Sequence, residues 1–124
     1  MKERRRRRAQ DPTGALRHQL DACREDAALQ AIMVSDDAGV CLAASGPAGT
    51  CDEIAARLPM IGRGGDDFAG ILLCAQGGWS VQVKKFHVGS AELYACTVGG
   101  KARPAARQLA RSVSGAARIL GDGA

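Results

Sequence analysis

Three consecutive segments typical of β-strands, 68–75, 79–88 and 91–98, constrain the fold more than any other part of this sequence. The first is almost continuously apolar, and the other two alternate apolar with polar residues. Glycine-containing turns at 76–78 and 89–90 separate the three segments. Strands joined by turns this short run antiparallel. The second half of the chain is therefore expected to form an antiparallel meander.

A further hairpin is predicted in the first half of the chain. Two short apolar segments, 29–34 and 40–44, flank the sequence Ser-Asp-Asp-Ala-Gly at 35–39. Aspartate favours the start of a tight turn, and Gly39 can adopt a positive φ at its end. This hairpin brings the expected number of strands to five.

Apolar residues at helical spacing predict one helix over about 12–25 and another over about 103–120. Asp11 is placed as an N-cap, with Pro12 in the first turn. The second of these helices also carries an arginine stripe, which is most simply a solvated face and alternatively a surface for an acidic partner. That stripe is Arg103, Arg107, Arg111 and Arg118. The apolar positions are Leu16, Leu20, Cys23 and Ala27 in the first helix, and Leu109, Val113, Ala116 or Ala117, and Leu120 in the last.

A middle helix is predicted to begin at a capping box formed by Thr50 and Glu53. Its apolar stripe consists of Ile54, Leu58 and Ile61. Pro59 lies deep in the helix and is expected to kink or shorten it. Residues 62–67 are rich in glycine and aspartate and are expected to end it.

The fold class that follows is α/β (α+β), with a five-stranded, mainly antiparallel sheet. The element order is helix, two strands, helix, three strands, helix. A chain of 124 residues holds one domain, expected over 11–120 with a tail at 121–124. Hydrophobic residues make up 46% of the chain and aromatic residues only 3%, so aliphatic side chains must build the core.

Positive charge is concentrated at the N-terminus. Residues 1–8 hold six of the 17 basic residues and one of the 13 acidic residues, so 11 basic and 12 acidic residues remain and the rest of the chain carries about −1. We interpret 1–10 as a disordered basic arm, because like charges repel and no apolar periodicity accompanies them. The arginines of this electrostatic arm are Arg4, Arg5, Arg6, Arg7 and Arg8.

Candidate chemical sites are weak, and we predict no catalytic residues, no metal site and no cofactor. The five cysteines lack the close pairs of structural zinc sites and are interpreted as reduced structural thiols. Cys51, at a predicted helix N-terminus, is the one candidate for a lowered thiol pKa, and no histidine lies near it in sequence. The glycines at 62–65 lack the Lys-Ser/Thr ending of a phosphate loop, and the aspartate pairs at 36–37 and 66–67 are typical of solvated turns.

The hairpin at 31–46 (AIMVSDDAGVCLAASG), the helix at 52–58 (DEIAARL) and the strand at 91–98 (AELYACTV) resemble the roadblock (dynein light-chain) family. The resemblance covers about residues 13–120. It departs from the family in the short middle helix and in the basic arm. It implies a profilin-like α/β (α+β) sandwich, in which a five-stranded sheet has two helices on one face and the middle helix on the other.

The resemblance also implies a homodimer in which the strands at 68–75 pair edge to edge and the middle helices pack together. An apolar strand without charge or proline is an aggregation hazard at a sheet edge unless it is paired, which favours such a dimer. A strand buried centrally within one monomer is the alternative. The expected interface residues are Ile54, Arg57, Leu58, Ile61, Phe68, Ile71, Leu72, Leu73 and Cys74.

For function, the resemblance implies a non-enzymatic adaptor or regulator of a small Ras-like GTPase. One alternative is binding of nucleic acid, acidic lipid or an acidic protein through the basic arm. Another is a small-ligand sensing domain, which needs an apolar pocket with converging polar groups. No segment of about 20 apolar residues and no secretory signal is present, so a cytoplasmic location is expected.

Overall fold

A computed structural model describes residues 12–62, 67–75 and 77–122. The basic arm, the proposed N-cap at Asp11 and residues 63–66 lie outside this description. The helices are α2 (Pro12–Asp26), α3 (Ala48–Gly62) and α4 (Ala102–Asp122). The strands are β1 (Ala31–Asp36), β2 (Cys41–Ser45), β3 (Asp67–Cys74), β4 (Gly77–Val88) and β5 (Ala91–Val98).

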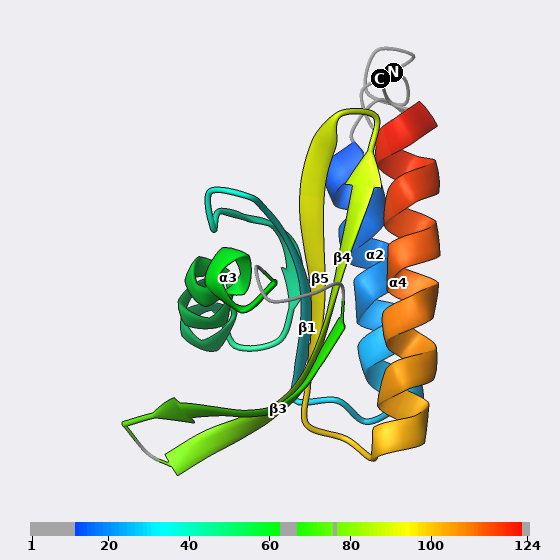
Figure 1. The fold of residues 1–124 in the computed structure, drawn as a ribbon. Coiled ribbons are helices and arrows are strands. Elements are labelled where there is room, and N and C mark those ends of the chain that lie inside the picture. The colour runs from blue at the N-terminus through cyan, green and yellow to red at the C-terminus, as the bar shows by residue number, and fades with distance from the viewer. Residues whose placement is uncertain (1–11, 63–66, 76, 123–124) are drawn as a thin grey trace.

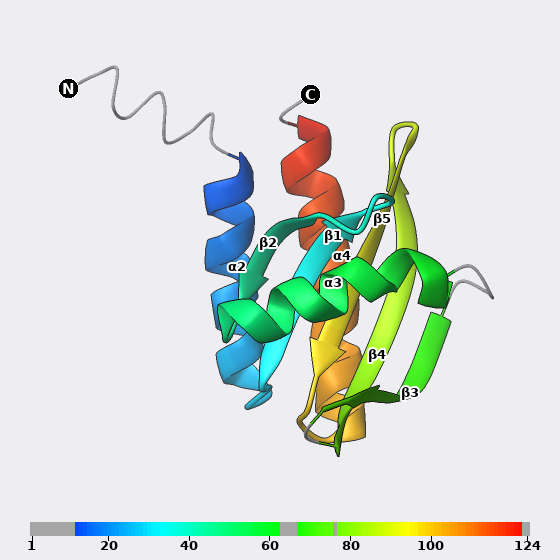
Figure 2. The same cartoon turned by 90° about the vertical axis from the view of Figure 1, so that its left-hand side faces the viewer.

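The five strands form one sheet in the order β2-β1-β5-β4-β3, and every neighbouring pair is antiparallel. Helices α2 and α4 cover one face of the sheet, and α3 alone covers the other (Figure 1). Figure 2 views the sheet from the α3 side and shows β2 and β3 at its two edges. The predicted element order and layer arrangement are confirmed.

Two apolar clusters on opposite sides of the sheet make up the core. Ile32 and Val34 of β1 point towards Leu16 and Leu20 of α2 and form the first cluster with α4. Met33, the residue between them, belongs to the second cluster on the α3 side. This alternation is the period of two expected of a strand whose two faces are both covered.

The hairpin between β1 and β2 is organised by the side chain of Asp36. Its Oδ1 accepts hydrogen bonds from the backbone N–H groups of Ala38 and Val40, each at 2.9 Å. Gly39 has a φ of 81°, and a Cβ there would lie 3.1 Å from the Cα of Ala56 in α3. Both the positive φ and the close approach to α3 therefore favour glycine at this turn.

The middle helix differs from its prediction at its start. Helix α3 begins at Ala48, and the carbonyl of Pro47 accepts from the N–H of Cys51 at 3.0 Å. Thr50 is already inside the first turn, so the predicted capping box is wrong. The backbone carbonyl of Pro47 begins the helix where the sequence had suggested a side-chain cap.

Proline does not end α3. The helix continues three residues past Pro59 to Gly62, because the proline removes one hydrogen bond near the helix end and leaves the packing on the sheet intact. Gly62 is buried, and a Cβ on it would lie 2.1 Å from the ring of Tyr94. The close contact between this helix end and β5 therefore depends on glycine.

Smaller differences concern the ends of the meander. The turn predicted at 76–78 is shifted, since Gly77 and Gly78 already pair with Cys74 and Leu73 as the start of β4; Gln76 is outside the described residues. The turn at 89–90 is confirmed, with Gly89 at a φ of 62°. Helix α4 extends to Asp122, into the predicted tail.

Candidate interaction surface at the β3 edge

Strand β3 lies at an edge of the sheet and has a neighbour on one side only, namely β4. Within the described residues, the alternative of a strand buried centrally in one monomer is therefore wrong. Ile71 is 61% exposed and Leu73 is 73% exposed, which is unusual for large apolar side chains on a strand. An exposed apolar edge of this kind marks a surface for pairing with another chain.

The register of the sheet shows which backbone groups of β3 face outward. The carbonyl of Ser80 in β4 accepts from the N–H of Gly99, on the β5 side, so Ser80 points away from β3. Ser80 is the partner of Ile71. In an antiparallel pair, the backbone N–H and C=O groups of two opposite residues either face each other or both face away from each other. The N–H and C=O groups of Ile71 therefore face the open edge, as do those of 67, 69 and 73 by the period of two.

One of these outward groups has a partner from α3. Nη1 of Arg57 donates a hydrogen bond to the carbonyl oxygen of Leu73 at 2.7 Å. The β3–β4 hairpin curls towards the side of the sheet that α3 occupies, which brings its end within reach of this helix (Figure 1). Among the predicted interface residues, Arg57 and Leu73 are thus brought together directly.

Two of the predicted interface residues on α3 are in the core instead. Ile54 and Leu58 have no exposed surface and pack against the sheet of their own chain. Their side chains are therefore unavailable to a partner, because the apolar stripe that they form is already covered. Ile61 is half-buried and packs against the same cluster.

The outer face of α3 presents a different set of residues, which the apolar stripe did not reveal. Met60 is 74% exposed and lies one turn beyond the exposed Ala56. Asp52 and Glu53 are exposed nearer the start of the helix. A large apolar residue at the i+4 position from a small one, on the side opposite the buried stripe, is the signal that could have identified this face.

The remaining predicted residues of β3 divide between its two faces. Leu72 is half-buried and packs against the α3-side cluster, and Cys74 is half-buried on the same face. Phe68 shares that face and is 37% exposed. Ile71 and Leu73 lie on the opposite face, the one that α2 and α4 cover elsewhere. The candidate surface is therefore the edge of β3, its exposed apolar side chains and the outer face of α3.

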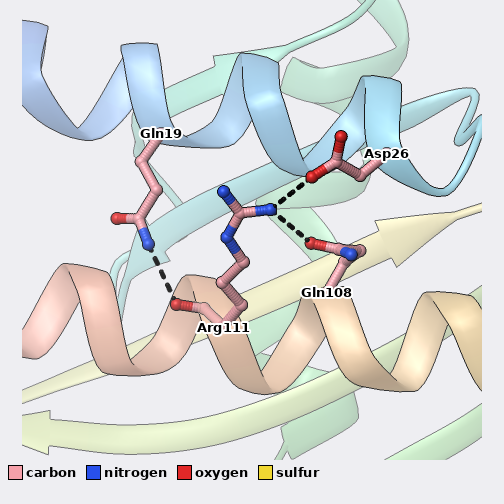
Figure 3. A network of polar contacts seen from close by, with 4 residues as sticks. All are labelled: Gln19, Asp26, Gln108 and Arg111. Carbon is pink, nitrogen blue, oxygen red and sulfur yellow. Dashed lines mark hydrogen bonds and ion pairs between the residues drawn. The ribbon is translucent and has the colours of Figure 1, made fainter.

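The helical layer on the far face is held by a polar network (Figure 3). Nη1 of Arg111 lies 2.6 Å from Oδ2 of Asp26 and 3.2 Å from Oε1 of Gln108, and Gln19 donates to the carbonyl of Arg111. Hydrogen bonding to Asp26 raises the pKa of Arg111. Arg111 is exposed, as expected of the arginine stripe, and it also ties α4 to α2 through Asp26.

The thiols do not provide an activated nucleophile. All five cysteines are free, and burial raises the pKa of Cys23, Cys51 and Cys96. Burial likewise raises the pKa of Cys41 to about 11. The suggestion of a lowered pKa at Cys51 is wrong, because Cys51 is only 1% exposed and loss of water around the thiolate raises its pKa.

A shallow groove of about 350 Å³ lies between α4 and the adjacent strands β3 and β4. Its polar groups are already paired with other protein groups: Lys84 with Asp67 at 3.3 Å, and Gln82 with the carbonyl of Ala102 at 2.9 Å. The groove therefore lacks the converging unpaired polar groups that a small-ligand site needs. Over the described residues, no three metal-ligating side chains come together, and none of the described helices is long and apolar enough to cross a membrane.

Comparison with known proteins was informative for solved structures only. No family model and no curated protein matches the sequence. An MglB structure with a tetrameric arrangement aligns with a TM-score of 0.68 at 10% identity, covering 92% of this chain and 93% of that one. The gliding protein MglB of Thermus thermophilus aligns at 0.66 and 11% identity, over 90% and 93%. A Roadblock/LC7 domain from Streptomyces avermitilis aligns at 0.57 and 15%, over 84% and 96%.

This chain has the roadblock fold. The similarity extends over nearly the whole chain, so the five strands and the three described helices form one roadblock-type unit. The family resemblance noted in the sequence is thereby confirmed at the level of fold. At identities of 10–15% the comparison does not extend to partner or activity.

Proposed function

We propose that this chain is a non-enzymatic, homodimeric adaptor or regulator that binds a small Ras-like GTPase, as scaffold or as GTPase-activating partner. The observation that carries the homodimer is the open edge of β3, which exposes both backbone groups and large apolar side chains. The GTPase follows from the roadblock resemblance, which the MglB-like fold supports. In such an assembly, GTP hydrolysis is the chemistry of the partner.

The proposed homodimer joins two β3 strands by antiparallel pairing about a twofold axis. Such pairing satisfies the outward N–H and C=O groups of 67, 69, 71 and 73 on both chains. It also brings two copies of α3 to the same face of a ten-stranded sheet. The exposed side chains of Met60 and Ala56 then lie where the two helices approach, and they replace Ile54 and Leu58 in the proposed contact.

The partner is tested by binding of purified full-length chain to a Ras-like GTPase from the same genome, loaded with GDP or with a nonhydrolysable GTP analogue. We expect binding that differs between the two nucleotide states, and a GTP hydrolysis rate measured in parallel distinguishes activation from scaffolding. A chain lacking residues 1–10 is the control, and it should bind equally well. Absence of binding in both nucleotide states would contradict the proposal, and binding lost with the arm would favour an electrostatic role instead.

A further inference from the structure

The hydrogen bond between Arg57 and Leu73 is placed where a second chain would have to bind. The carbonyl of Leu73 belongs to the outward-facing set of β3, because Leu73 lies two residues from Ile71, which faces away from β4. A guanidinium group at 2.7 Å therefore occupies a hydrogen-bond acceptor of the open edge. Proteins commonly protect sheet edges with charged side chains in this way.

The symmetry of the proposed pairing makes this acceptor important. When β3 pairs antiparallel with a second copy and uses all four outward residues, 67 pairs with 73 of the second copy, and 69 pairs with 71. The carbonyl of Leu73 must then accept from the N–H of Asp67 of the second copy, and this bond forms twice in the dimer. The row of hydrogen bonds between the two β3 strands therefore has an Arg57 side chain at each end, one from each chain.

The apolar side chains at this end of the edge are exposed to solvent. Leu73 is 73% exposed, and Ile71 beside it is 61% exposed on the same face. Within the described part of the strand, the ion pair of Asp67 with Lys84 lies at the opposite end of β3 and joins it to β4, so it leaves the outer edge open. Among the described residues, Arg57 is therefore the one side chain seen to bind an outward backbone group of β3.

We propose that Arg57 is a guard of the β3 edge: it holds the Leu73 carbonyl in the free protomer and is displaced when a second copy of the chain pairs with β3. This role rests on the proposed homodimer and changes the part of Arg57 within it. Arg57 opposes dimerisation, and the dimer forms because its full ladder and apolar contacts outweigh the lost hydrogen bond. The guard also disfavours pairing with short or partly matched strands, which cannot offset that loss.

The test is the dissociation constant of the dimer for Arg57→Ala, measured by sedimentation equilibrium against the wild type. We expect it to fall about fivefold to tenfold, because two solvent-exposed hydrogen bonds, one on each chain, no longer have to be broken when the dimer forms. Arg17→Ala removes the same charge from an exposed site on α2, the helix that packs on β2 at the opposite edge of the sheet, and should leave the constant unchanged. Arg57→Lys retains a donor with poorer geometry and should give an intermediate value.

Amide hydrogen exchange provides the second readout and shows whether the same edge is used. In Arg57→Ala, the N–H groups of 69, 71 and 73 should become protected at lower protein concentration than in the wild type. An unchanged or weaker dimer in Arg57→Ala, with a native circular dichroism spectrum, would overturn the guard while leaving the homodimer in place. If neither wild type nor variant dimerises at any concentration, the proposed homodimer itself fails, and the wild type alone reveals this.

Discussion

The two edge strands of the sheet, β2 and β3, differ in length, in the helices that pack against them and in the exposure of their side chains. β2 has five residues, and both α2 and α3 pack against it. Nε of Arg24 in α2 donates to Oγ of Ser45 at 2.7 Å, which fixes the end of the strand. β3 has eight residues, exposes Ile71 and Leu73, and receives one hydrogen bond from α3. The β2 edge is short and flanked by its own helices, and the β3 edge is long and leaves large apolar side chains exposed.

This difference separates what the fold needs from what a partner needs. A short edge strand flanked by helices on both faces offers few outward N–H and C=O groups and little apolar surface to another strand. A long apolar edge with outward N–H and C=O groups can accept another strand, and leaving it open carries a risk of aggregation. Such a risk of aggregation is expected only where the edge binds a partner. For this reason we propose that β3 forms the homodimer interface.

The largest effect is expected where the α3 stripe meets the sheet. Leu58→Ala should lower the free energy of unfolding by about 2–5 kcal/mol, because Leu58 is fully buried in the α3-side cluster. Leu73→Ala should lower it by less than about 0.5 kcal/mol at a concentration where the protein is monomeric. Urea unfolding measures both. Similar losses for the two variants would contradict the assignment of Leu58 to the core and Leu73 to the accessible edge.

A charge on the open edge should break the dimer. Ile71→Lys is expected to raise its dissociation constant at least about tenfold, since it places two like charges beside the twofold axis of the paired strands. Val40→Lys is the matched control, because Val40 is 56% exposed and lies beside β2, the opposite edge strand of the sheet. Size-exclusion chromatography with light scattering measures both. If the two lysines raised the dissociation constant equally, the assignment of the dimer interface to β3 would be contradicted.

Removal of the Arg24 side chain should affect stability without affecting assembly. Arg24→Ala loses the hydrogen bond to Ser45 and is expected to lower the free energy of unfolding by about 1 kcal/mol. Its dimer dissociation constant should match that of the wild type. Arg17→Ala, an exposed arginine on the same helix, serves as the stability control. A weakened dimer in Arg24→Ala would indicate that the interface lies at β2 and would contradict its assignment to β3.

The smallest predicted effect is a pH dependence of stability that arises from Cys41 in β2. Burial raises the folded-state pKa of Cys41 to about 11 from a value near 9 in the unfolded chain. The folded state therefore binds the thiol proton more tightly, so this contribution to stability is full below pH 9 and is lost as pH rises from 9 to 11. Cys41→Ala should show a shallower decline over this window in urea unfolding. An equally steep decline would exclude Cys41 as its source.

Local signals predicted much of this fold. The limits of β5 agree with the prediction, and so does the turn at Gly89, because strict alternation and a glycine at positive φ are local properties. The placement of helices on both faces of the sheet was implied by the roadblock resemblance and did not follow from local signals. The start of α3 was misplaced because a side-chain cap was inferred where a backbone carbonyl begins the helix.

The candidate surface was less accessible to sequence reasoning. Ile54 and Leu58 were assigned to a dimer interface, yet a helix with a single apolar stripe can bury it only once, and here the sheet buries it. The hydrogen bond between Arg57 and Leu73 joins residues 16 apart in sequence and depends on the curl of the β3–β4 hairpin. Neither periodicity nor composition contains that information.

Strand β3 is proposed to be an edge that pairs with a second copy of this chain. Sedimentation equilibrium of the full-length protein over a wide concentration range tests it most directly, with amide exchange of 69, 71 and 73 followed on the same samples. We expect the mass to rise towards twice the 12.9 kDa of the chain while those amides become protected. A constant mass of 12.9 kDa with unprotected amides at every concentration would contradict the claim.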